Sequence, residues 1–78
     1  DIATEPESPK SSLQEYLQAR RKKPYYRITD IIGPPHDRVF QAEVYCDDET
    51  LGTGEGHSKK AAEAAAAARA LKALGASK

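Results

Sequence analysis

The first regular pattern of apolar residues along the chain has the spacing of an α-helix. Apolar side chains recur there at intervals of three and four residues, and they are Leu13, Tyr16 and Leu17. A serine followed three residues later by glutamine or glutamate is a typical helix start, and Ser11 and Ser12 both have this arrangement. Pro24 disfavours helical backbone at the residue before it, so we expect the helix to end at about Lys22.

Three stretches that follow have the composition of β-strands. Residues 25–32 are rich in β-branched and aromatic residues, with Tyr26, Ile28 and Ile32 at even spacing, and they predict a first strand. Residues 38–46 alternate strictly, which predicts an antiparallel strand with one buried face made of Phe40, Ala42, Val44 and Cys46. After a polar turn at residues 47–49, the glycine-rich residues 50–55 predict a short third strand whose glycines permit close approach of another backbone.

The C-terminal stretch consists almost entirely of strong helix formers. Ser58 is a suitable N-cap, residues 59–74 predict a second helix, and Gly75 is a plausible C-cap. Leu71 and Leu74 mark its inward side, and the small residues that let it lie close to the sheet are Ala62, Ala65, Ala66 and Ala70. These elements predict an α+β fold of order α-β-β-β-α, with both helices packed on one face of a three-stranded antiparallel sheet.

Length and composition limit the class of protein. With 78 residues, we expect one domain over residues 10–75, a flexible tail or interdomain linker over residues 1–9, and a short tail over residues 76–78. Cys46 is the only cysteine, so an internal disulfide and a cysteine-based zinc site are excluded. No apolar run approaches the roughly 18–20 residues that a membrane span needs. We expect a soluble, cytoplasmic protein with no membrane partner, and we expect the natural chain to continue upstream.

The formal net charge of zero conceals an uneven distribution of charge. Residues 1–9 hold three of the 12 acidic residues and none of the 12 basic ones, which leaves the remainder with a net charge of +3. Basic residues cluster at residues 20–23 and at Lys59 and Lys60, whereas acidic residues concentrate at residues 47–49. The folded surface is therefore expected to be bipolar, with basic patches suited to an anionic partner.

Three separated pieces of the sequence together match one known family. They are residues 10–15 at the first helix, Gly33 to His36 in the loop between the first two strands, and residues 52–63, which lead from the glycine-rich third strand into the second helix. In these pieces the chain resembles the double-stranded-RNA-binding domain, most closely the C-terminal one of bacterial ribonuclease III. The resemblance covers residues 10–74. It implies binding of double-stranded RNA by a monomeric domain that belongs to a ribonuclease III-like endoribonuclease, itself a homodimer.

The shape of duplex RNA explains why separated pieces are needed. The A-form major groove is too deep and narrow for side chains to read, so a protein must contact 2′-hydroxyls in the minor groove and phosphates across the major groove. By resemblance, the phosphate contacts belong to Ser58, Lys59 and Lys60, where the dipole and N–H groups of a helix N-terminus also attract anions. The alternative is that both lysines are merely exposed at a helix start.

The resemblance assigns the two minor-groove contacts to the first helix and the loop. Residues at intervals of three and four share one helix face and present hydroxyl, amide and carboxylate groups, and they are Ser11, Gln14, Glu15 and Gln18. His36 is the implied probe of a second minor groove, stiffened by Pro34 and Pro35. Plainer alternatives are that Glu15 completes a capping box and that His36 is simply solvated. Glu63 stands where many relatives in the wider family carry a base, which suggests slightly weaker phosphate attraction.

Two other functions have less support from the residues. Metal-dependent cleavage needs convergent carboxylates, but the available groups lie in a turn or alternate along a strand, and they are Asp47, Asp48, Glu49, Glu55, His36 and His57. We therefore expect no catalytic residue, metal site or cofactor in this chain, and Mg²⁺ only in a separate catalytic domain. The second alternative is a protein-interaction or dimerisation module of the same fold. The large apolar residues expected on the uncovered sheet face, Ile31, Val39 and Tyr45, are too few to favour it.

Overall fold

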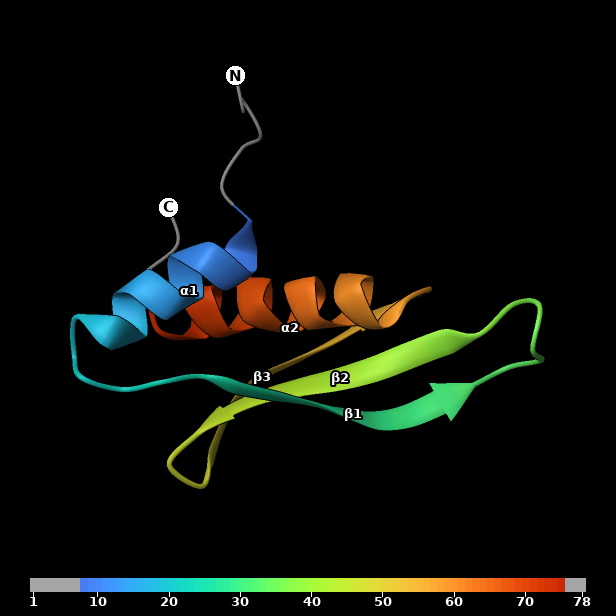
Figure 1. The fold of residues 1–78 in the computed structure, drawn as a ribbon, viewed down its shortest axis with the longest axis horizontal. Helices are drawn as coiled ribbons and strands as arrows, with labels where there is room; N and C mark the ends of the chain where they lie inside the picture. Colours follow the sequence, from blue (N-terminus) through green and yellow to red (C-terminus); the bar gives the residue numbers. More distant parts are fainter. Residues whose placement is uncertain (1–7, 76–78) are drawn as a thin grey trace, which may run out of the picture.

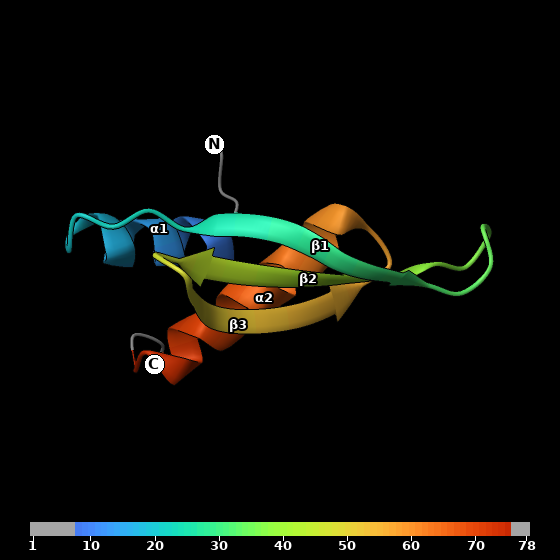
Figure 2. The ribbon, with the colours of Figure 1, turned by 90° about the horizontal axis from the view of Figure 1, so that it is seen from below.

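Two helices and three strands follow one another in the predicted order. The computed structural model describes residues 8–75, with α1 (Pro9–Gln18), β1 (Tyr25–Ile32), β2 (Val39–Cys46), β3 (Glu49–Gly56) and α2 (Lys59–Ala73) (Figure 1). The strands form one antiparallel sheet of order β1-β2-β3, and both helices lie on one face of it, as Figure 2 shows from the opposite side. The predicted α+β fold is confirmed. Residues 1–7 and 76–78, assigned above to tails, lie outside the described residues.

Helix α1 begins earlier than the sequence pattern predicted. Its N-cap is Ser8, whose hydroxyl accepts a hydrogen bond from the Ser11 amide at 3.2 Å, and Pro9 is its first residue. The prediction of a cap at Ser11 or Ser12 was therefore wrong. Proline favours the first helical position, where its missing N–H is no loss, so the Ser-Pro pair is itself a start signal. Both residues belong to the stretch 1–9, whose acidic bias predicted a tail, and the structure instead places them at the start of α1.

Helix α1 also ends four residues before the predicted end at Lys22. After Gln18 the chain turns through Arg21, which has a left-handed backbone with φ of 60°. The Arg21 amide donates to the Gln18 carbonyl and the Lys22 amide to the Leu17 carbonyl, both at 2.9 Å. This pair of bonds is the Schellman arrangement that ends many helices, usually with glycine at the left-handed position. Because the chain has no glycine there, this helix end could not be predicted from the residue types.

The strands agree closely with their predicted ranges. Strand β2 alternates as expected, with every second residue directed toward the helices. A two-residue turn joins it to β3, and Asp47 and Asp48 both have positive φ, 50° and 69°, as a type I′ hairpin turn requires. Glu49 already pairs with Cys46, so β3 is one residue longer at each end than residues 50–55.

A bulge in β1 changes which residues face the helices. Ile28 pairs with Ala42 but Asp30 pairs with Gln41, so Thr29 is an extra residue and the alternation shifts by one. Ile31 then lies opposite Phe40, on the helix side of the sheet. The prediction that Ile31 belongs to the uncovered face was wrong, because a period of two cannot reveal an inserted residue. The side chain is nevertheless 47% exposed, since it lies near the end of the strand.

The core lies between the sheet and the two helices. Its buried members are Leu13 and Leu17 from α1, Ala42 and Val44 from β2, and Ala62, Ala66, Ala67, Ala70 and Leu71 from α2. The glycines of β3 let α2 rest directly on the strand. A Cβ atom built on Gly54 would lie 2.3 Å from the Ala66 amide nitrogen, and one on Gly52 would lie 2.7 Å from the Ala66 carbonyl oxygen. The predicted close backbone approach is therefore present.

Candidate nucleic-acid interface

The start of α2 presents two unpaired basic side chains beside a capped helix end. Ser58 is the N-cap as predicted, and its hydroxyl accepts a hydrogen bond from the Ala61 amide at 3.0 Å. Lys59 and Lys60 occupy the first turn and are exposed. Within residues 8–75, neither ammonium group forms an ion pair. Two ammonium groups, the remaining first-turn N–H groups and the helix dipole thus create a site of positive potential.

The loop between β1 and β2 is held in a tight turn that projects His36. The Asp37 amide donates to the Pro34 carbonyl at 2.9 Å, which closes the turn around Pro35 and His36. Gly33 precedes it with φ of 98°, and a Cβ there would lie 2.6 Å from the Asp37 carbonyl oxygen. Glycine is therefore required at this position. Both prolines and His36 are exposed, as contact with a partner requires.

A contact that the sequence did not predict brings this loop near the start of α2. His57 Nε2 lies 3.7 Å from Asp37 Oδ1, and both side chains are largely exposed. The loop and the residue before the α2 N-cap also line a common open hollow, formed by Pro35, His36, Asp37, Arg38, Phe40 and His57. The two groups thus belong to one continuous surface. No local pattern signals a contact between residues 20 positions apart.

The third predicted group lies on the outer face of α1. Its members are all exposed, opposite the buried Leu13 and Leu17, and they are Ser11, Gln14, Glu15 and Gln18. The Ser11 hydroxyl accepts a hydrogen bond from that of Ser8, so it is tied to the helix cap. Along the horizontal axis of Figure 1, α1, the start of α2 and the β1–β2 loop follow one another from left to right. The three groups are therefore separated along the molecule, with the lysines in the middle.

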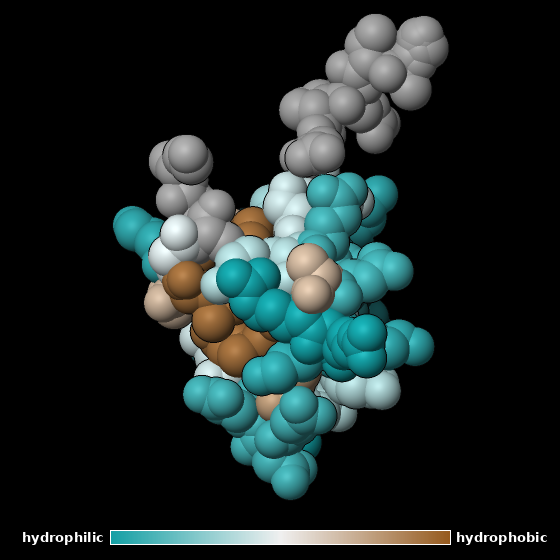
Figure 3. All heavy atoms as spheres, turned by 90° about the vertical axis from the view of Figure 1, so that its left-hand side faces the viewer, coloured by the Kyte–Doolittle hydropathy of each residue, from teal (hydrophilic) through white to brown (hydrophobic). Residues whose placement is uncertain are grey.

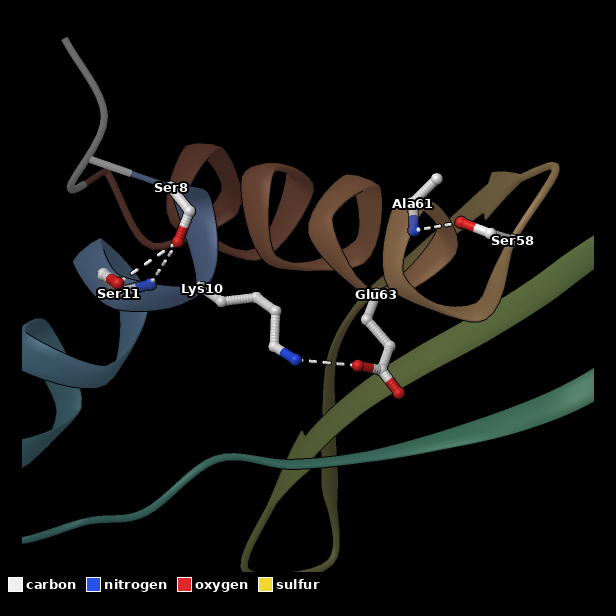
Figure 4. Close-up of polar contacts among 6 residues, drawn as sticks. All are labelled: Ser8, Lys10, Ser11, Ser58, Ala61 and Glu63. Atoms are coloured by element: carbon white, nitrogen blue, oxygen red, sulfur yellow. Dashed lines mark hydrogen bonds and ion pairs between the residues drawn. The ribbon is translucent and has the colours of Figure 1, made fainter. Parts of the chain in front are cut away.

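An ion pair joins the two helices beside this surface. Lys10 Nζ lies 2.7 Å from Glu63 Oε1, and Figure 4 shows the Lys10 side chain extending from α1 toward Glu63 on α2. The same ammonium lies 4.7 Å from the centre of the Tyr26 ring. Burial, followed by the neighbouring Glu63 carboxylate, raises the pKa of the Tyr26 hydroxyl to about 12. Sequence reasoning treated Glu63 only as a missing base and did not predict its partner.

The other end of the molecule has a different character. There, at the ends of both helices and the β2–β3 turn, apolar side chains gather in a patch rimmed by polar residues (Figure 3). A hollow at this end is lined by Leu17, Cys46, Leu51 and Leu74 among others. Arg20, from the basic stretch 20–23, lies over the Tyr16 ring at 3.7 Å and donates to the Tyr16 carbonyl. Of the predicted contact residues, Gln18 lies nearest to this end, as the last residue of α1.

The acidic and histidine side chains do not gather into a site. Among residues 8–75, no three His, Cys, Asp or Glu side chains are placed to hold a metal ion. Glu55 instead accepts a hydrogen bond from the Gln41 amide at 2.7 Å on the open sheet face. In the same part of the chain, no helix has the length and apolar character needed to span a membrane.

Comparison with known proteins gives consistent results. The family described as "Double-stranded RNA binding motif" matches residues 9–74. Ribonuclease 3 of Dehalococcoides mccartyi is 52% identical over 63 residues, which are 80% of this chain and 27% of the relative. Ribonuclease 3 of Borreliella afzelii is 48% identical over 66 residues, 83% of this chain and 27% of the relative. The chain thus spans about a quarter of the length of these curated relatives.

Two solved structures resemble the fold. The first dsRBD of protein HYL1 superposes with a TM-score of 0.67 and 38% identity, over 85% of this chain and 94% of that one. Dicer from Pichia stipitis superposes with a TM-score of 0.65 and 30% identity, over 82% of this chain and 31% of that one. The family match over residues 9–74 spans both helices and the sheet, and therefore every element that carries a predicted contact group.

Proposed function

Because the chain belongs to the family of the double-stranded RNA binding motif, we propose that it binds A-form RNA duplexes through the three exposed groups on α1, the β1–β2 loop and the start of α2. In this proposal the α1 side chains and His36 enter two successive minor grooves, while Lys59 and Lys60 contact phosphates across the major groove between them. The observation that carries the proposal is the order of the groups along the molecule, with the unpaired lysines in the middle.

The chemistry of each group supports its proposed partner. Ammonium groups at a helix N-terminus suit phosphate, whose charge also interacts favourably with the helix dipole. Amide and carboxylate groups such as those of Gln14 and Glu15 suit 2′-hydroxyls, which both donate and accept hydrogen bonds and which DNA lacks. The rigid loop lets His36 enter a groove without a large loss of conformational entropy. Recognition then depends on duplex shape more than on base sequence.

The proposal extends to the parent protein. High identity to two ribonuclease 3 sequences, over about a quarter of their length, supports a role as the RNA-binding part of a ribonuclease III-like endoribonuclease. Cleavage and its Mg²⁺ ions then belong to a separate catalytic domain, and the chain itself has no catalytic residue. We propose that the domain is monomeric, that the parent enzyme is a homodimer, and that both work in the cytoplasm, where an unpaired cysteine is stable.

The decisive experiment is a binding titration with RNA duplexes of increasing length. Affinity should rise until a duplex of about 16 base pairs offers both minor grooves, and DNA of the same sequence should bind more weakly. An RNA–DNA hybrid tests the 2′-hydroxyl contribution separately. All strands should stay intact with and without Mg²⁺. Tight binding to an 8-base-pair duplex or equal affinity for DNA would contradict the proposed footprint, and strand scission would contradict the division of labour.

A paired substitution locates the phosphate contacts. Lys59→Ala together with Lys60→Ala should weaken binding to all duplex sequences alike and should reduce the magnitude of the log–log salt slope by just under one unit per lost contact. Lys72→Ala is the matched control, because Lys72 lies exposed in the last turn of the same helix. An unchanged slope in the double variant would place RNA elsewhere. Failure to bind any duplex, with self-association instead, would favour the dimerisation module.

A further inference from the structure

The Lys10–Glu63 ion pair engages a carboxylate that would otherwise compete with phosphate for the lysines of α2. Glu63 follows Lys59 by four residues and Lys60 by three, the separations at which opposite charges pair along a helix. A glutamate in that position can pair with either lysine, although a pair with the lysine first is weaker than one with the glutamate first. In the structure its carboxylate contacts Lys10 from the other helix at 2.7 Å instead.

The surroundings of the pair favour this choice of partner. The Lys10 and Glu63 side chains are 38% and 24% exposed, so their attraction is less screened by water than that of a fully exposed pair. Lys10 also gains from its position over the Tyr26 ring, a cation–π contact that the lysines at the start of α2 do not make. Figure 4 shows the bridge spanning the gap between the helices, away from Ser58 at the α2 start.

We propose that Lys10 is a positioning residue of the RNA interface, which holds the Glu63 carboxylate between the helices and so keeps both ammonium groups of α2 free for phosphate. The proposal rests on the proposed function, since it concerns the same two lysines. It also revises the effect expected of Glu63 from sequence. Within the bridge Glu63 is neutralised by Lys10, and it lowers phosphate affinity only when Lys10 is absent.

The test is a double-mutant cycle measured with a 16-base-pair RNA duplex. Lys10→Ala releases Glu63 toward Lys59 and should weaken binding about tenfold, with a salt slope smaller by about one unit. Glu63→Gln should change affinity by no more than about twofold, because the charge it removes is already compensated. The variant with both changes should bind within about threefold of the unmodified chain and should recover its salt slope.

Two results of the cycle would overturn the proposal. If Lys10 binds RNA directly, the loss will persist in the double variant. If the charges act only through long-range attraction, the fold-changes in affinity of the two single variants will multiply to give that of the double variant. The cycle will then show no coupling between Lys10 and Glu63. Lys72→Ala gives the size of a general effect from losing one positive charge. A further check is Lys59→Ala, which should cost less affinity in the Lys10→Ala background than alone, because Glu63 has already neutralised Lys59.

A measurement without RNA separates this inference from the proposed function. The side-chain NMR signals of Lys59 should shift in Lys10→Ala and return in the double variant with Glu63→Gln. Unshifted signals would overturn the proposal whether or not RNA binds, whereas failure of the unmodified chain to bind duplex RNA would overturn the proposed function alone. Unfolding midpoints must show that each variant is folded. If Lys10→Ala is not, Lys10→Gln retains most of the side chain over Tyr26 and replaces it in the cycle.

Discussion

The two faces of the sheet are built from alternate residues of the same strands, yet different interactions hold them. On the covered face, α2 lies against the backbone of β3, and the β2 residues Ala42, Val44 and Cys46 are at most 4% exposed. On the open face, Arg27 Nε lies 2.8 Å from Glu43 Oε1, and the Thr50 hydroxyl donates to the other carboxylate oxygen of Glu43. Burial dominates one face and paired polar groups dominate the other.

The difference indicates where the sequence tolerates change. Removing apolar surface from water stabilises a fold by roughly 25 cal/mol per Å², whereas exposed ion pairs contribute about 0–1 kcal/mol. Two neighbouring positions of β2 should therefore differ several-fold in their effect on stability. The open face is consequently free to carry charge and aromatic stacking, such as the Tyr25–Tyr45 pair with ring centres 5.8 Å apart. Four substitutions test the contrast, in decreasing order of effect.

Gly54→Ala should have the largest effect. The added Cβ would lie 2.3 Å from the Ala66 amide nitrogen and 2.5 Å from the Ala65 carbonyl carbon, so α2 must lift off the sheet. We expect the free energy of unfolding to fall by about 3 kcal/mol or more, most of the roughly 3–5 kcal/mol typical of such a small domain. Urea denaturation measures it. Gly75→Ala is the control, with open space around it but φ of 75°, and should cost only about 1 kcal/mol.

Val44→Ala should come next. Val44 is fully buried, so the substitution removes two methyl groups from the core and leaves a cavity, at a cost of about 2 kcal/mol. Gln41→Ala, on the open face of the same strand, should stay within about 0.5 kcal/mol of the unmodified chain. Both values come from chemical denaturation at pH 7. Equal losses of unfolding free energy at Val44 and Gln41 would show that the two faces contribute alike to stability.

Tyr26→Phe should have an effect that depends on pH. The Tyr26 hydroxyl is buried without a hydrogen-bond partner among the described residues, so its removal should cost little at pH 7. Burial raises its pKa in the folded state to about 12, above the unfolded value of 10.0. Folding therefore favours the protonated form, and this stabilisation is complete below pH 10 and lost as pH rises toward 12.

The phenylalanine variant should accordingly lose less stability than the unmodified chain between pH 10 and 12. The difference should be about 1 kcal/mol, allowing for partial exposure of the ring. Tyr25→Phe on the open face serves as the control, and urea midpoints at pH 7, 10 and 12 give the comparison. Parallel pH curves for Tyr26→Phe and the unmodified chain would show that the hydroxyl is solvated.

Glu43→Gln on the open face should have the smallest effect. Hydrogen bonds from Thr50 and then Arg27 hold the pKa of the Glu43 carboxyl below its usual value of 4.5. The folded state therefore favours the carboxylate, which contributes stability above pH 4.5 that is lost as pH falls through the lower folded value. The variant should have a slightly lower unfolding midpoint than the unmodified chain at pH 7. This difference in midpoint should become smaller toward pH 3 and in high salt. A difference in midpoint that persists at pH 3 would mean that the charge of Glu43 is not its cause.

Local signals explain which parts of the fold the sequence predicted well. The alternation in β2, the Ser58 cap and the alanine-rich helix depend on neighbours a few residues apart, and all were located correctly. The ends of α1 were misplaced because Ser8 lies within a stretch without periodicity and because Arg21 adopts a conformation that glycine usually signals. The extra residue at Thr29 breaks the period of two and was equally invisible.

The candidate site likewise has parts that could be predicted from the sequence and parts that depend on long-range contacts. Its residue types were identified by resemblance, and the structure leaves all of them exposed. The contacts that position these residues could not be predicted from the sequence, because contacts between residues far apart in the chain produce no periodic pattern. Lys10 and Glu63 are 53 positions apart, and Asp37 and His57 are 20 apart. These contacts connect the three groups into one surface, so they carry the geometry from which function is proposed.

The buried thiol of Cys46 makes the molecule a built-in reporter of its own fluctuations. It is 4% exposed and is the only cysteine in the chain, at the end of the molecule away from the proposed RNA surface. Because so little of Cys46 is exposed, a thiol reagent should label it mainly when that end opens, so the labelling rate in native buffer measures how often opening occurs. If the opening that exposes Cys46 also abolishes binding, duplex RNA should slow labelling, which would indicate unfolding of the whole domain. Labelling that RNA does not affect would indicate fraying of that end alone.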